Sequence, residues 1–244
     1  MTDTTAAPGR FGAALATTAL ALGLLCAAGA LLAGPLYRIG VLPLGGGIGT
    51  VRWAATGALV GAALGLIALL TGGPRGRASA ALVLNLLVAA PPLWMYRQVQ
   101  TLPRIHDISN DTADPPAFVA VLPLRAGARN PVDWKPETAA PQKAGYPDLA
   151  PLVLPVPPAL AMARAERAAR AMGWAIVAVQ AEQGRLEATD TTRLFGFQDD
   201  VVIRVRPQGS GSVVDVRSLS RVGGSDFGTN AKRVREVLRR ISAP

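Results

Sequence analysis

The stretch RLEATDTTRLFGFQDDVVIR, residues 185–204, decides the fold of this chain. Apolar and polar side chains alternate over 185–192 and again over 201–206, as they do in half-buried strands. The Phe-Gly-Phe sequence at 195–197 predicts a tight turn between the two segments. We therefore expect a β-hairpin, and it carries the densest set of polar side chains in the C-terminal part of the chain.

Short connections on both sides extend this hairpin into an antiparallel sheet. The predicted elements are, in order, a helix over 157–172, strands over 174–180, 185–192, 201–206 and 213–220, and a final helix capped by Ser225 or Asp226. The apolar stripe of the final helix is expected to be buried and consists of Phe227, Ala231, Val234, Leu238 and Ile241. The fold class is therefore α+β, in the order αββββα, with both helices on one face of a four-stranded sheet over 157–244.

The first two-fifths of the chain is apolar enough to lie in a membrane. After a polar tail at 1–9, the membrane domain at 10–100 contains three uncharged runs, at about 11–33, 53–71 and 78–96. Runs of this length match the hydrocarbon thickness of a bilayer, so we expect three transmembrane helices. Pro91 and Pro92 predict a kink or an early end in the third helix.

Small residues predict close helix packing within this membrane domain. Gly57, Gly61 and Gly65 recur every four residues, so they share one face of the second run and let a neighbouring backbone approach. The neighbour is either the first run, where small residues at 19, 23 and 27 have the same spacing, or another protomer.

Positive charge near the predicted helix ends sets the expected orientation. Arg75 and Arg77 lie in a very short loop, where positive charge most strongly favours the cytoplasmic side. With three helices the N-terminus shares that side. We therefore expect the N-terminus inside and the C-terminal domain outside the cytoplasm.

The segment at 101–156 is rich in Pro, Asp, Ala and Gly. Prolines recur too often for long helices or central strands, because each one removes a backbone hydrogen-bond donor. We expect an extended arm, here called the arm, that docks on the domain through residues 118–122 and Trp134.

Composition argues against several function classes. Beyond residue 97, 19 basic residues are interleaved with 15 acidic ones, without the cationic patch of a nucleic-acid-binding protein. Cys26 and His106 are the chain's one cysteine and one histidine, which excludes an intrachain disulfide and a Cys/His zinc cluster. No P-loop, dinucleotide-binding fingerprint or Gly-x-Ser-x-Gly sequence is present. We therefore expect no nucleic-acid partner and no cofactor.

Several separate blocks resemble the DUF1499 family, a family of unknown function. They are, in order, PRIHDISNDT at 103–112, DPPAF at 114–118, LEATDTT at 186–192, FGF at 195–197, DDVVIRV at 199–205, VDVRS at 214–218, SRV at 220–222 and NAKR at 230–233. The resemblance covers about residues 101–242 and implies no catalytic residue. It implies an envelope or organelle-membrane protein, and we expect a multi-pass protein of the bacterial inner membrane with a periplasmic domain.

His106, Asp107 and Asp111 form the first candidate ligand or metal site, together with Ser109 and Asp114. The Asp-x-Ser-x-Asp start is that of a calcium loop, but the sixth and twelfth positions lack the required Gly and Glu, which excludes an EF-hand. A looser calcium or magnesium site is one alternative. A turn in which these side chains bond to local backbone is the other, and the favoured one.

The hairpin itself supplies two further candidates. Asp190, Asp199 and Asp200 are expected to come together, where adjacent carboxylates could share a proton or hold a metal. The favoured alternative pairs these carboxylates, and Asp215 on the next strand, with the sheet arginines Arg193, Arg204 and Arg217. The rings of Phe195 and Phe197 either form a lip for a hydrophobic ligand such as a lipid or close one end of the core.

These observations favour a binding or scaffold module held at the membrane, with the bilayer and other membrane or envelope proteins as partners. Its ligand would be a partner protein, a lipid or another envelope component. One alternative is a membrane-anchored hydrolase or metal-dependent enzyme that uses the cluster of Asp190, Asp199 and Asp200. A third hypothesis is an accessory subunit of a transporter.

Overall fold

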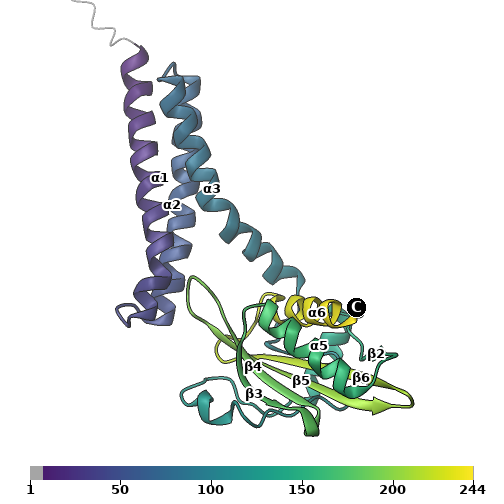
Figure 1. Ribbon diagram of the computed structural model, residues 1–244. Helices are drawn as coiled ribbons and strands as arrows, with labels where there is room; N and C mark the ends of the chain where they lie inside the picture. The colour runs from purple at the N-terminus through teal and green to yellow at the C-terminus, as the bar shows by residue number, and fades with distance from the viewer. Residues whose placement is uncertain (1–7, 244) are drawn as a thin grey trace, which may run out of the picture. The chain divides into compact units, whose positions relative to one another are not determined.

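The computed structural model describes residues 8–243. The chain divides into two compact units, residues 1–97 with 193–196, and residues 98–192 with 197–244. The first unit contains long apolar helices and the second contains an antiparallel sheet with helices (Figure 1). This confirms the two classes of structure that the sequence predicts.

Three helices are long and apolar enough to cross a membrane: α1 (Pro8–Arg38), α2 (Leu44–Leu70) and α3 (Arg75–Thr101). The expected tail at 1–9 lies largely outside the described residues, and α1 already includes residues 8 and 9. α3 contains Pro91 and Pro92 and continues to Thr101, so the expected early end is wrong. Long apolar helices tolerate proline because neighbouring groups can satisfy the freed backbone carbonyls.

The glycines of α2 make room for the other two helices. A Cβ added at Gly57 would lie 2.8 Å from Sγ of Cys26 on α1, and one added at Gly65 would lie 3.1 Å from the backbone nitrogen of Leu82 on α3. Both distances are too short for ordinary contact, so the absence of a side chain is what permits this approach. The glycine face of α2 therefore packs against helices of the same chain.

Asn85 on α3 is fully buried between these helices. Its Nδ2 donates hydrogen bonds to the carbonyl oxygens of Ala19 (2.9 Å) and Ala81 (2.8 Å). A Cβ added at Gly61 would lie 2.2 Å from Oδ1 of Asn85, and one added at Gly23 would lie 2.7 Å from Nδ2. The two glycines thus form the space that holds the amide.

Replacing Gly61 with Ala should destabilise the helical unit by about 1–3 kcal/mol, because the new methyl group overlaps an amide fixed by two hydrogen bonds. Gly49→Ala in the same helix is the matched control, since a Cβ there meets nothing within 4 Å. Unfolding of the full-length protein in a titration with SDS measures the difference. Equal stability of the two variants would show that Gly61 is not a packing position.

The second unit is built from strands and short helices. In chain order they are β1 (Asp107–Ser109), the 3₁₀ helices η1 (Leu122–Arg125) and η2 (Pro136–Thr138), α4 (Ala139–Gly145), β2 (Leu152–Leu154), α5 (Pro158–Ala171), β3 (Ala175–Gln180), the 3₁₀ helix η3 (Ala181–Gln183), β4 (Arg185–Thr191), β5 (Gln198–Gln208), β6 (Gly211–Ser220) and α6 (Thr229–Ser242). Everything from α5 to α6 follows the predicted order.

The sheet has six strands rather than the four expected. Its order is β1-β6-β5-β4-β3, with β2 also paired to β6, and every pair is antiparallel. The two additional strands come from the arm, and they pair with residues 217–219 and 212–214 of β6. Each is three residues long, which is too short to show the alternation by which a strand is recognised.

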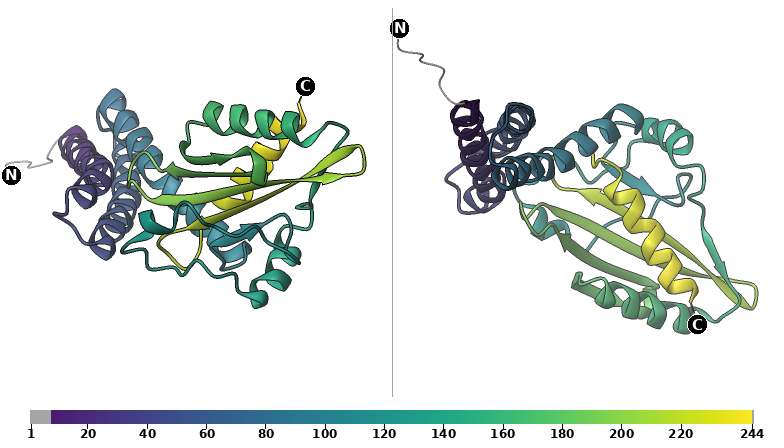
Figure 2. Two further views of the ribbon diagram at one scale, coloured as in Figure 1. Left: turned by 60° about the horizontal axis from the view of Figure 1, so that its bottom comes forward. Right: turned by 90° about the horizontal axis from the view of Figure 1, so that it is seen from above.

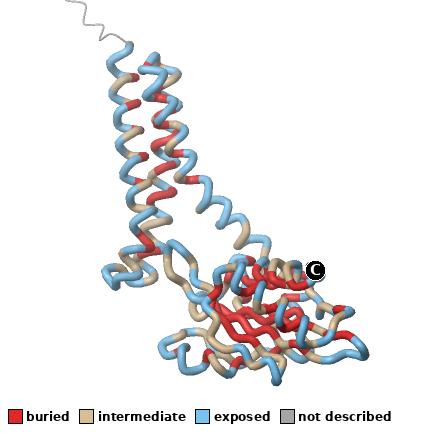
Figure 3. The backbone as a smooth tube through the Cα atoms, viewed as in Figure 1, coloured by how far each residue is buried: buried red, intermediate tan, exposed pale blue. Residues whose placement is uncertain are grey.

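The two faces of the sheet are covered by different parts of the chain. α5 and α6 cover one face, and the arm covers the other (Figure 2). Within the second unit, the residues coloured as buried are concentrated in the sheet (Figure 3). The core under the helices includes Leu186, Ala188, Val201, Ile203, Val214 and Val216, whereas the core under the arm includes Phe118, Val121, Val202 and Leu219.

The start of α6 differs from the prediction. Asp226 accepts hydrogen bonds from the backbone N–H groups of Gly228 (3.1 Å) and Asn230 (2.6 Å), which have no partner within the helix. The helix itself begins at Thr229, three residues after Asp226. Phe227, expected in the buried stripe, is 40% exposed. It precedes the helix and has a left-handed φ of +52°, so it lies off the helical repeat.

Candidate functional site

The face of the sheet under the arm carries charge and is nevertheless buried. Glu187 on β4, Asp200 on β5 and Asp215 on β6 are each 0% exposed, and Arg217 on β6 is 3% exposed. Charges taken out of water at such positions are tolerated only when they are paired and hydrogen-bonded. The partners therefore define this site.

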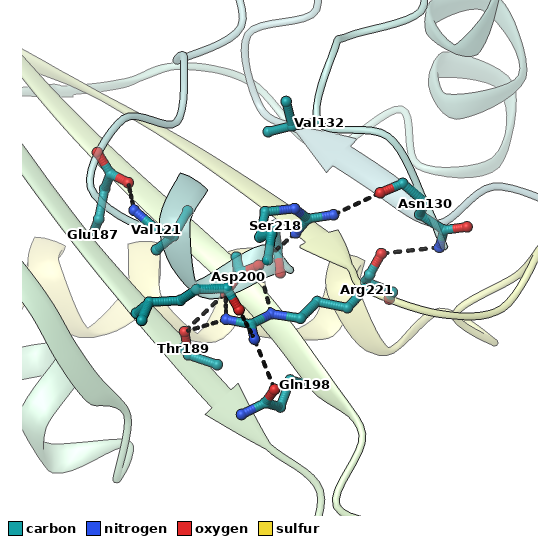
Figure 4. A network of polar contacts seen from close by, with 12 residues as sticks. Val121, Asn130, Val132, Glu187, Thr189, Gln198, Asp200, Ser218 and Arg221 are labelled. Atoms are coloured by element: carbon teal, nitrogen blue, oxygen red, sulfur yellow. Dashed lines mark hydrogen bonds and ion pairs between the residues drawn. The ribbon is translucent and has the colours of Figure 1, made fainter. Parts of the chain in front are cut away.

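Asp200 is held by two arginines and a hydroxyl group. Arg221 donates from Nη2 to Oδ1 (2.8 Å) and from Nε to Oδ2 (3.0 Å), and Arg125 of the arm also donates to Oδ2. Oγ1 of Thr189 donates to Oδ1 at 2.8 Å. Figure 4 shows Arg221, Thr189 and Asp200 converging, with Gln198 on the same guanidinium. The carboxylate is thus fully occupied.

Arg217 is enclosed by the arm. It binds Asp107 of β1 through Nε (2.9 Å) and Nη2 (2.7 Å). Its guanidinium carbon lies 5.0 Å from the ring centroid of Phe118 and 5.5 Å from that of Trp134, which are cation–π distances. Burial raises the pKa of Asp107, and the hydrogen bonds from Arg217 oppose that rise. The docking residues of the arm therefore contact a charge as well as apolar side chains.

Glu187 holds the backbone of the arm. Its carboxylate accepts hydrogen bonds from the N–H groups of Val119 (3.0 and 3.1 Å) and Val121 (3.0 Å), and Figure 4 shows the bond to Val121. Arg185 lies 3.3 Å from the same carboxylate. Hydrogen bonds from backbone donors to a charged acceptor are stronger than neutral ones. A buried side chain thus takes the place of a strand partner for this segment.

Asp215 belongs to a third group on the same face. Its Oδ2 lies 3.0 Å from Nη2 of Arg204 and 2.8 Å from Nη2 of Arg206. Asp111 and Asp114 of the arm contact the same two arginines at 3.0 to 3.6 Å. The predicted pairing of Arg204 with Asp215 is therefore present, within a larger group that includes two arm residues.

Asp190 and Asp199 lie on the opposite face, under α6. Arg233 of α6 donates from Nε to Asp190 (2.8 Å) and from Nη2 to Asp199 (2.7 Å). Successive side chains of a strand point to opposite faces, so Asp200 points away from its neighbour and towards the arm. The structure therefore brings Asp190 and Asp199 together as cross-strand partners on Arg233, but it leaves Asp200 on the other face, and all three pair with arginines other than those expected.

The first candidate set is also dispersed. Asp107 binds Arg217, whereas Oδ1 of Asp111 accepts hydrogen bonds from the backbone N–H groups of Ala113 (3.1 Å) and Asp114 (3.0 Å). This is the local turn geometry of an Asx side chain. Phe195 and Phe197, the two rings of the hairpin turn, are half-buried and fall in different compact units.

His106 lies in a shallow hollow of about 290 Å³ at the surface of the second unit. The hollow is lined by Arg104, Ile105, His106, Asp107, Pro131, Asp133, Lys135, Glu137, Thr138 and Pro141. Partial burial lowers the pKa of His106, while the nearby Asp107 raises it and Lys135 lowers it further. The hollow therefore combines a neutral imidazole at pH 7 with exposed charges of both signs.

Chemistry at the buried face is restricted by this pairing. Within residues 8–243, no three His, Cys, Asp or Glu side chains are grouped so that they could hold a metal ion. Using Asp200 as a base or a metal ligand would deprive the buried Arg125 and the largely buried Arg221 of their charge partner, which is strongly unfavourable. The arrangement is suited to holding the arm on the sheet.

The sequence model of DUF1499, described as a protein of unknown function, matches residues 107–241. These residues make up more than half of the chain. The chain belongs to the DUF1499 family. The match begins at β1 and ends within α6, so the DUF1499 domain includes the arm as well as the sheet. No curated protein sequence matches the chain.

Several residues that organise the DUF1499 domain were missed from the sequence. Glu187, Arg125, Arg221 and Arg233 were not among the candidates, although each binds a carboxylate or a backbone segment far away in the chain. Among these residues, only Glu187 could be recognised locally, because it is a charged residue that alternates with Leu186 and Ala188 in a predicted strand. This alternation indicates that a polar partner lies over that face of the sheet, but it does not identify the partner.

Asp200→Asn should lower the free energy of unfolding by about 3–5 kcal/mol, because it leaves the buried Arg125 and the largely buried Arg221 without a charge partner. Glu166→Gln on α5 is the matched control, since its pair with Arg170 is at the surface and contributes no more than about 1 kcal/mol. Urea unfolding of the full-length protein in detergent, followed by tryptophan fluorescence, gives both values. Equal losses would show that the Asp200 network does not stabilise the domain.

Proposed function

We propose that the DUF1499 domain of this chain is a non-catalytic binding module for a partner protein, held at a membrane by α1, α2 and α3. The observation that supports this proposal is that the charged groups of the domain fall into two sets, one paired inside the domain and one exposed to solvent. The charged residues inside the domain are committed to one another, as Asp200 is to Arg125 and Arg221, whereas the hollow beside His106 presents charges to solvent.

The dimensions and charges of the hollow favour a protein over a small molecule. Its volume of about 290 Å³ lies at the lower end of ligand pockets. Arg104 and Lys135 are exposed there beside Asp133 and Glu137. Mixed charge around a shallow surface matches the polar rim of a protein–protein interface, in which complementary charges choose the partner and orient it.

We place the module in a bacterial inner membrane with the DUF1499 domain in the periplasm. The support for this orientation is Arg75 and Arg77, at the start of α3 beside the four-residue connection from α2. Positive charge in a short loop favours the cytoplasmic side. With three spanning helices, the domain that follows α3 then lies on the other side of the membrane.

A photo-crosslinking amino acid at Glu137, in the full-length protein in intact cells, should capture one discrete exported or membrane protein. The same amino acid at Arg167, exposed on α5, is the matched control and should not capture that protein. Lys135→Glu should abolish the product by reversing a charge at the interface while leaving thermal stability unchanged.

Three results would contradict the proposal. Equal amounts of the crosslinked product from both positions would show that the interface is not at the hollow. A crosslinked product that persists in Lys135→Glu would show that the charges of the hollow do not contribute to the interface. Capture of a cytosolic protein would reverse the orientation.

A further inference from the structure

Phe227 is held in a backbone conformation that bulky side chains avoid. Its φ is +52°, and every other residue of 8–243 with a left-handed φ is a glycine. A glycine would adopt this conformation without strain, so the backbone alone gives no reason for a phenylalanine here. The ring is 40% exposed, so burial in the core does not offset the strain. Strain of this kind is typical of residues that contact something outside the fold.

Hydrogen bonds on both sides impose this conformation. The backbone N–H of Asp226 donates to the carbonyl oxygen of Ile105 (3.1 Å), and its buried carboxylate accepts from Gly228 and Asn230. The N–H of Phe227 itself donates to Oγ of Ser225 (3.3 Å). The loop at 225–228, here called the Phe227 loop, is therefore fixed to the segment around residue 105, and it presents the ring to solvent.

The Phe227 loop lies beside the point where the chain leaves α3. A Cβ added at Gly228 would lie 2.9 Å from Cδ1 of Leu102, the residue that follows the end of α3. Trp94 and Tyr96 of α3 are 56% and 64% exposed, and aromatic side chains near the end of a spanning helix lie at the membrane interface. At a rise of 1.5 Å per residue, Leu102 is at most about 9 Å beyond Tyr96, and the headgroup layer is about 5–8 Å thick on each side of a bilayer, so Leu102 follows directly on that layer.

We propose that Phe227 inserts into the interfacial layer of the membrane that α3 enters, and thereby fixes the DUF1499 domain at the lipid surface. This inference rests on the membrane anchoring in the proposed function. A bilayer is favoured over a partner protein because Gly228 of the loop adjoins Leu102, the residue that directly follows α3 in the chain. Exposed cations lie on the two segments next to the loop: Arg104 precedes Ile105, which accepts the hydrogen bond from Asp226, and Lys232 is in the first turn of α6. Positive charge at these positions suits anionic headgroups.

The test uses single cysteines in the full-length protein, with Cys26→Ala removing the native thiol. Phe227→Cys carries an environment-sensitive NBD fluorophore, and the protein is placed in nanodiscs that contain phosphatidylglycerol and a phosphatidylcholine with a spin-label quencher near the headgroup. Val153→Cys on β2, 61% exposed, is the matched surface control. NBD at 227 should emit at shorter wavelength and be quenched several-fold more than NBD at 153.

Leu87→Cys on α3, 66% exposed, reports on the anchoring by itself. Quenching at 87 with a signal at 227 equal to that at 153 would overturn the insertion of Phe227 and leave the membrane anchor intact. If NBD at position 87 were as exposed to water as NBD at position 153, both the membrane anchoring and the insertion of Phe227 would be contradicted. As a second variant, Phe227→Gly should raise thermal stability in detergent, where strain is relieved, and speed hydrogen exchange of residues 225–230 in nanodiscs. Unchanged exchange in nanodiscs would count against insertion.

Discussion

The structure of the DUF1499 domain depends on the burial of paired charges between the sheet and the arm. Glu187, Asp200 and Arg217 stand on the face of the sheet that the arm covers, so docking of the arm removes them from water. The cost is offset only if the arm supplies backbone donors, Arg125 and aromatic rings in the right places. The arm can therefore be largely irregular and still be fixed, because side-chain partners replace the regular backbone ladder.

This constraint also limits function. The carboxylates that would attract a chemical interpretation are paired with arginines, and the two neighbours Asp199 and Asp200 serve different faces of the sheet. The proposals for recognition therefore concern the periphery of the domain, namely the hollow around His106 and the Phe227 loop. His106 is close in sequence to Leu102, the residue that follows α3, and Gly228 of the Phe227 loop adjoins Leu102 in space.

The sequence predicts what is encoded locally. Alternation over 201–206 placed Val201 and Ile203 on one face, and apolar length located the three helices, because both signals are periodic within a few residues. Long-range partners have no such signal: Asp107 and Arg217 are 110 residues apart, and β1 and β2 are too short to alternate. The alternation of side chains along a strand is by itself enough to predict that Asp199 and Asp200 point to opposite faces of the sheet. The expected cluster was wrong only in including Asp200, because proximity in sequence was given more weight than that alternation.

Hydrogen exchange of the full-length protein in detergent tests the central claim most directly. Glu187→Gln removes the charge that holds the arm while keeping the side-chain shape. A hydrogen bond to a charged group is worth about 1.5–3 kcal/mol, so the amides of Val119 and Val121 should exchange roughly tenfold faster or more. Amides of β5 and β6 should keep their protection, and Glu182→Gln, exposed in η3, should change nothing. Unaltered protection of Val119 and Val121 in Glu187→Gln would contradict the claim that buried charge holds the arm on the sheet.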